Sequence, residues 1–140
     1  MGSVWPSVRS AQWDEDTVSL QKKLAEYCRA ILKAKRGKAI FFNFLTHITK
    51  HCDCMDNPFK PDIADIGIVA SMDPVAIEKA TVDIVRDRAG TDFFKDAWPQ
   101  IDYTIQIAYA QEIGLGSMDY ELIPCGQDAG VVADGVFSKN

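Results

Sequence analysis

The chain has 140 residues, the size of one domain, and 47% of them are hydrophobic, which is enough to bury a core without disulfides. With 20 acidic and 15 basic side chains its formal net charge is -5, which argues against a nucleic-acid-binding surface, because such surfaces cluster Lys and Arg. It shows no apolar run of membrane-spanning length and no secretory signal, and four cysteines are too few for a secreted disulfide scaffold. We therefore expect a soluble, cytoplasmic protein with neither nucleic acid nor membrane as a partner.

The first half of the chain predicts one helix followed by one strand. Residues 1–16 read as an irregular N-terminal arm. A helix is predicted over residues 18–35, with Gly37 as its stop. Its apolar residues recur at helical spacing: Leu20, Leu24, Tyr27, Cys28, Ile31 and Leu32. Residues 39–45 are continuously apolar and aromatic until Asn43, which is typical of a strand covered on both faces.

A long connection over residues 46–62 leads to a second predicted buried strand over residues 65–70. The next helix begins at Asp73, a good N-cap, and Pro74 fits its first position, while Gly90 marks its end. Its buried side is expected to be lined by Val75, Ala76, Ile77, Ala80, Ile84 and Val85.

The last third of the chain predicts two more helices and a short strand. A short helix carries the aromatic cluster Phe93, Phe94 and Trp98, and a second spans residues 101–113. Residues 120–123 are a candidate final strand, and residues 124–140 read as a mobile tail. Alternating helices and buried strands predict a single α/β layered domain over residues 1–140, with a small sheet of few strands flanked by helices. So thin a sheet predicts that the domain belongs to a larger α/β fold or pairs with another chain.

The long connection holds the most unusual group of side chains. Both histidines of the chain, His47 and His51, lie four residues apart, and His51 is followed by Cys52 and Cys54. Thiolate and imidazole are the ligands that suit zinc and iron, so these four residues are a candidate metal site. The pattern is not the Cys-x-x-Cys of zinc ribbons, and no second pair follows at ribbon spacing. The alternative is therefore that both cysteines are small, partly buried hydrophobic residues.

A second candidate group is polar and flanks the second strand: Asp62, Asp65, Ser71 and Asp73. Asp65 is bounded by apolar residues, and a buried carboxylate needs partners. It is either part of a cation or base site, or a hydrogen-bond acceptor for backbone amides of the long connection. Asp73 is explained by its capping role. No phosphate-binding loop and no nucleophile–base pair is visible, so a hydrolase or other metal enzyme is the weakest interpretation.

Several separated motifs resemble, in order, a bacterial and archaeal family of unknown function whose members are labelled uncharacterised iron–sulfur centre proteins. The resemblance covers about residues 18–123. It is carried by the Cys52-Asp53-Cys54 run, by residues 61–71, by residues 73–80 and by residues 110–116 with 120–123. It implies a longer protein with an N-terminal α/β part and a ferredoxin-like segment that is absent here, so this chain resembles the C-terminal portion.

From the residues and this resemblance, two functions of different classes are predicted. In the first, the chain is the C-terminal domain of an iron–sulfur centre protein with a redox or electron-transfer role. Its Cys52 and Cys54 loop then binds a single zinc or iron ion, holds an iron–sulfur cluster, or faces a cluster held by a ferredoxin-like domain or chain. In the second, the chain is a non-catalytic structural or binding module that pairs with a partner domain, a partner chain or a second copy of itself, and binds no cofactor.

Overall fold

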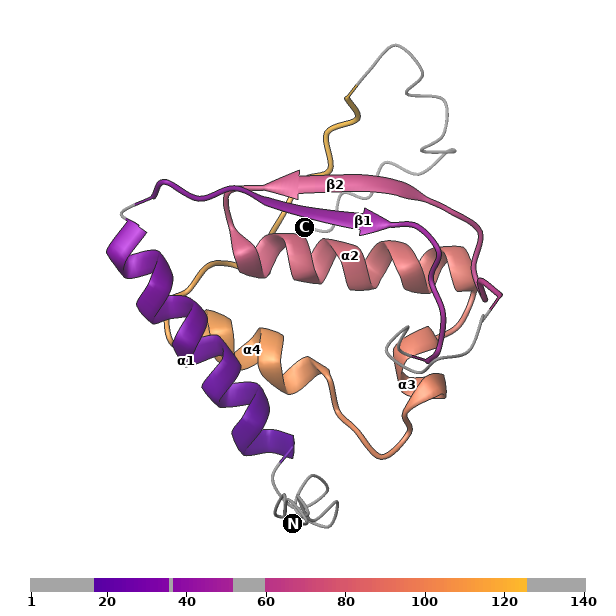
Figure 1. Cartoon of the computed structure of the whole chain (residues 1–140), viewed down its shortest axis with the longest axis horizontal. Helices are drawn as coiled ribbons and strands as arrows, with labels where there is room; N and C mark the ends of the chain where they lie inside the picture. The colour runs from indigo at the N-terminus through magenta and orange to yellow at the C-terminus, as the bar shows by residue number, and fades with distance from the viewer. Residues whose placement is uncertain (1–16, 36, 52–59, 126–140) are drawn as a thin grey trace, which may run out of the picture.

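The computed structural model describes residues 17–35, 37–51 and 60–125. The expected N-terminal arm, the Cys52 to Cys54 segment and most of the expected tail therefore lie outside the described residues. The elements are α1 (Thr17–Lys35), β1 (Phe41–Leu45), β2 (Gly67–Ser71), α2 (Pro74–Ala89), α3 (Phe93–Ala97) and α4 (Thr104–Glu112). This order of helices and strands confirms the predicted α/β layered domain with a small sheet (Figure 1).

The described sheet consists of β1 and β2, which pair antiparallel, with Phe42 opposite Ala70 and Phe44 opposite Ile68. Helix α2 runs along one face of this sheet (Figure 1). Side chains alternate between the two faces of a strand, so every second residue of β1 points toward α2. Asn43 is one of these, and its amide Nδ2 donates to Thr81 Oγ1 of α2 at 2.9 Å.

The core contains two clusters of buried residues, one at each end of α2. One joins α1 to α4 and the start of α2 and contains Ala25, Val75, Ile107 and Ala110. The other lies between the sheet, α2 and α3 and contains Leu45, Ile63, Val85 and Phe93. Both clusters include side chains of α2, so this helix is the shared central element of the domain.

The ends of α2 agree with their sequence signals. Asp73 is the N-cap, and its Oδ1 accepts hydrogen bonds from Val75 N at 2.8 Å and Ala76 N at 3.0 Å. Pro74 follows as the first helical residue, where its missing N–H costs nothing. Gly90 ends the helix in the left-handed conformation, with φ of 70°.

Three local expectations were wrong. The last helix begins at Thr104, not at residue 101. The Asp102 side chain accepts a hydrogen bond from Thr104 N, an arrangement typical of the residues just before a helix. Residues 120–123 do not pair as a strand within the described residues. Both strands were expected to be covered on both faces, yet the face of the sheet turned away from α2 is exposed among the described residues. No helix in the described ranges has the length and apolar character needed to cross a membrane.

Candidate functional site

The structure describes the residues that flank the candidate metal loop on both sides. We call residues 46–51 and 60–66, which approach one another from either side of the loop, the loop neck. Ile48 and Ile63 form an isolated antiparallel bridge there, and Asp62 N donates to Ile48 O at 2.8 Å. Ile63 is buried in the core cluster under the sheet, so the neck is anchored to the domain.

Two of the predicted site residues hold this neck together. Asp65 Oδ1 accepts from His47 N at 2.8 Å, and Asp62 Oδ2 accepts from Lys50 N at 2.8 Å. The expectation that Asp65 is buried was wrong: it is exposed within the loop neck, where its carboxylate accepts a hydrogen bond from a backbone amide. The alternative, that Asp65 accepts from backbone amides of the long connection, is confirmed.

The two histidines differ in their surroundings. His47 adopts a left-handed backbone conformation with φ of 52°, the one such non-glycine residue among those described. A residue in this region is strained, and its bond to Asp65 stabilises it there. His51 lies edge-on to Trp98 at the end of α3, with ring centroids 6.4 Å apart and planes at 87°. The structure thus constrains the backbone of His47 and gives the ring of His51 an aromatic neighbour.

The described residues do not by themselves assemble a metal site. No group of three or more His, Cys, Asp or Glu side chains suited to a metal ion occurs among them. Cys28 lines an apolar cavity beside α1, and α1 lies across the molecule from α3 and the neck (Figure 1). Cys125 is exposed after α4. Cys28 therefore does not fit as a further metal ligand beside Cys52 and Cys54. The role of Cys52 and Cys54 as metal ligands stays a prediction.

The remaining predicted polar residues have structural roles. Asp73 caps α2 through Oδ1 and accepts from Ser117 N through Oδ2 at 2.9 Å. Ser71 Oγ accepts from Asp73 N at 3.0 Å. The carboxylate of Asp73 thus ties the start of α2 to the turn after α4. Its geometry is that of a cap with an added tertiary hydrogen bond.

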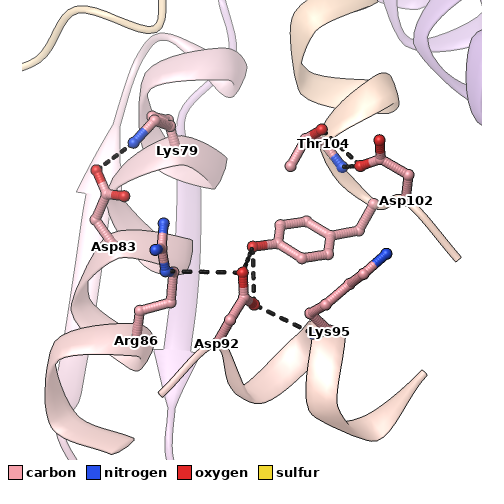
Figure 2. Close-up of polar contacts among 8 residues, drawn as sticks. Lys79, Asp83, Arg86, Asp92, Lys95, Asp102 and Thr104 are labelled. Atoms are coloured by element: carbon pink, nitrogen blue, oxygen red, sulfur yellow. Dashed lines mark hydrogen bonds and ion pairs between the residues drawn. The ribbon is translucent and has the colours of Figure 1, made fainter. Parts of the chain in front are cut away.

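A polar network links α2 to α3 and α4 (Figure 2). Asp92 is its centre: both carboxylate oxygens accept from the Tyr103 hydroxyl at 3.0 Å, and Arg86 Nε lies 3.8 Å from Oδ2. Burial and these hydrogen bonds to Asp92 raise the pKa of Tyr103 to about 12. Nearby, Asp83 pairs with Lys79 and accepts from the Tyr120 hydroxyl. These carboxylates are engaged within the domain, so the network fastens helices together.

The feature that sequence reasoning missed is the outward surface of the sheet. We call it the open face, and it consists of Ile40, Phe42, Phe44, Ile68, Ala70 and Met72. Phe44 is 66% exposed and Met72 71% exposed. Every side chain of this face is apolar, whereas an antiparallel sheet that faces water normally carries polar residues there. The continuous apolar run of each strand signalled two apolar faces, and the structure shows that the described residues cover one.

An apolar cavity of about 250 Å³ adjoins this face. It lies between α1, β1, α2 and α4, and both Leu24 of α1 and Phe42 of the open face line it. Cys28 also lines it, and burial, followed by the charge of Glu78, raises the pKa of this thiol. The expectation that Cys28 is a packing residue agrees with this half-buried position.

Comparison with known proteins identifies one family. The family described as a domain of unknown function (DUF362) matches residues 1–83, which is more than half of the chain. No curated protein and no solved structure matches the chain. The matched residues include α1, both strands and the loop neck, so the match agrees with the resemblance to a family of unknown function. The chain belongs to the DUF362 family.

Proposed function

We propose that this chain is a non-catalytic binding module that docks another folded α/β domain onto its open face. The observation that carries the proposal is that, among the described residues, a helix covers one face of the sheet while the other face, which is entirely apolar, is exposed. Phe42 and Phe44 on β1 and Ile68 on β2 are 53%, 66% and 60% exposed. Leaving such side chains in water forgoes the hydrophobic stabilisation that burial would supply.

The size of the open face supports a specific interface. From the fractional exposures of its five large side chains, its apolar area is roughly 600 Å², the upper end of what monomeric proteins expose. A standard interface covers about 800 Å² on each partner, so the open face would supply most of one. The partner would then bury the apolar face of the sheet as α2 buries the other.

The chemistry of the partner follows from the sheet. Within the described residues, β1 and β2 each pair on one side only, so each has a free edge. An edge that carries apolar residues on both faces is suited to extension by further strands, and such extended sheets are covered by helices on both faces. The partner that fits this sheet best is therefore an α/β domain that adds strands to one of the free edges and places a helix on the open face.

The test changes the open face without touching the core. We would replace Phe42 and Phe44 with Ser, and use Ile123→Ser as the matched control, since Ile123 is 73% exposed outside the open face. The wild-type protein should bind a hydrophobic dye and self-associate at micromolar concentration. The double variant should lose both properties and keep its unfolding midpoint. A wild-type protein that is strictly monomeric and does not bind dye would contradict the proposal.

A photo-crosslinking amino acid at position 44 identifies the partner in cells of the source organism. One defined α/β protein, crosslinked at position 44 and absent at position 123, is the expected product. The same product at both positions would reflect non-specific adhesion and would argue against a dedicated interface.

The second candidate is the redox function in which Cys52 and Cys54 bind a metal or face a cluster held by a ferredoxin-like partner. The observation that favours it is the loop neck, where Asp62 and Asp65 fix both sides of the loop base. When bound, an iron–sulfur cluster or an iron ion would supply one-electron transfer, and zinc would supply a structural site. This chain's thiolates would hold that group, and the neck would position them.

Elemental analysis of anaerobically purified protein, with its visible absorption spectrum, tests this candidate. Iron with broad visible absorbance, or zinc near one equivalent, would support it if Cys52→Ser with Cys54→Ser abolished the metal and Cys125→Ser did not. A colourless, metal-free and folded protein would leave only a cluster held by the partner. No change in the redox behaviour of the complex in the double variant would then reject that role as well.

A further inference from the structure

Helix α1 carries two neighbouring rows of side chains, and only one of them is packed. The inner row contains Gln21 and Ala25, which are 8% and 2% exposed and lie against α4, where Gln21 Oε1 accepts from Gln106 N. We call the other row the outer stripe. It consists of Leu20, Leu24, Tyr27 and Ile31, which are 38%, 49%, 69% and 59% exposed. The outer stripe thus consists of four large apolar side chains that the described residues leave exposed.

The spacing of the outer stripe is that of a helix-packing surface. Its members follow one another by four, three and four residues, the alternation with which one helix presents knobs to another. Leu24 also lines the apolar cavity together with Phe42 of β1, so the stripe borders this cavity at Leu24.

The charge of α1 selects the partner. The helix contains five basic residues and one acidic residue, a net charge of +4, so the rest of the chain carries -9 of the total -5. Lys23 and Lys35 lie within one helical turn of the outer stripe, at the positions that flank a helix seam. Opposite charges at these flanking positions favour pairing and like charges oppose it.

We infer that the outer stripe of α1 binds an acidic amphipathic helix of the partner protein. This inference rests on the proposed function and adds the chemistry of the partner at α1. A second copy is disfavoured, because pairing α1 with α1 would bring two helices of net charge +4 together. An anionic membrane surface is also disfavoured, because the rest of the chain is strongly negative.

The probe is a synthetic amphipathic helix of about four heptads, with Leu and Ile at the seam and Glu at the flanking positions. Its control has the same seam and Lys at those flanks. Fluorescence anisotropy with the full chain should show the Glu peptide binding at least about tenfold more tightly than the Lys peptide at physiological ionic strength. Equal binding of the two peptides, or no binding of the Glu peptide, would overturn the inference.

Variants of the chain separate the stripe from the open face. Leu24→Gln with Ile31→Gln should weaken the binding of the Glu peptide at least about tenfold. Lys23→Glu with Lys35→Glu should reverse the preference between the peptides, whereas Lys33→Glu, on the far side of the helix, should leave it unchanged. Circular dichroism would confirm that each variant is folded.

Three further outcomes keep this test distinct from the test of the open face. Phe44→Ser should leave peptide binding unchanged. The proposal for the outer stripe can therefore be rejected while the proposal for the open face is supported, and the reverse. Tighter binding to phosphatidylserine vesicles than to the Glu peptide would replace the inference with a membrane surface. Dimerisation that the variants at Leu24 and Ile31 abolish would replace it with a second copy.

Discussion

The contact between Asp73 and the turn after α4 leads to a quantitative prediction about stability. Replacing Asp73 with Ala removes the acceptor for two amides at the start of α2 and the acceptor for Ser117 N. Loss of a helix cap costs about 1 to 2 kcal/mol, and leaving a partly buried amide without its charged acceptor costs about 1 to 2 kcal/mol more. We therefore expect Asp73→Ala to lower the free energy of unfolding by about 3 kcal/mol, and Asp73→Ser, which retains a cap, by about 1 kcal/mol.

Gly116 is coupled to the same carboxylate. An ideal Cβ at Gly116 would lie 2.0 Å from Asp73 Oδ1 and 2.7 Å from Oδ2, so any larger residue must displace the side chain that forms these hydrogen bonds. Gly116→Ala alone should therefore cost about as much as Asp73→Ala, about 3 kcal/mol. In the Asp73→Ala background, where no carboxylate remains to be displaced, it should cost less than about 1 kcal/mol.

Urea unfolding followed by far-ultraviolet circular dichroism measures both effects as a double-mutant cycle. The expected coupling free energy is about 2 kcal/mol. Lys60→Ala, an exposed substitution remote from this turn, serves as the control and should change the midpoint little. Additive effects of Asp73→Ala and Gly116→Ala, or a cost below about 0.5 kcal/mol for Asp73→Ala, would refute the assigned role of this carboxylate.

Three further predictions concern the neck, the polar network and the cavity. Asp65→Ala should speed hydrogen exchange at the His47 amide by about tenfold, because it removes the acceptor at 2.8 Å; unchanged exchange would show that the neck holds without it. Tyr103→Phe should cost about 1 kcal/mol. Since the pKa of Tyr103 is raised above 10, this contribution is full below pH 10 and is lost as the pH rises toward 12; a pH-independent difference between Tyr103→Phe and wild type up to pH 12 would contradict it. In a variant without the two loop cysteines, a thiol reagent at pH 8 should label exposed Cys125 before Cys28, whose pKa is raised; the reverse order, read by mass spectrometry, would disprove the placement.

Local signals were sufficient to predict most of the elements. Asp73 with Pro74 predicted where α2 begins, and Gly90 predicted where it ends, because caps depend on a few consecutive residues. The first helix was predicted from the helical spacing of its apolar residues, and both strands were predicted from short apolar runs, which are also local features. The strand expected over residues 120–123 was wrong, since a strand exists only if another strand lies beside it.

The candidate site was harder to predict, because burial is a property of the folded chain. Apolar neighbours made Asp65 look buried, yet it lies exposed at the neck and binds a backbone amide. The cysteines drew attention by their rarity, while Phe42 and Phe44 read as ordinary core. Reactive groups can be recognised from residue type alone. An interface made of common apolar residues is recognised only when the exposure of those residues is known.

The sequence by itself determined the class of the domain, the helix boundaries at α2 and the apolar character of both strands, because these depend on spacing along the chain. Only the tertiary structure decided which apolar surfaces are used inside the domain. Helix α2 covers one face of the sheet, and α4 takes up the row of α1 that contains Gln21 and Ala25. Among the described residues, the outer stripe of α1 and the open face are left outward, because the helices and the two-stranded sheet bury only the surfaces that face one another.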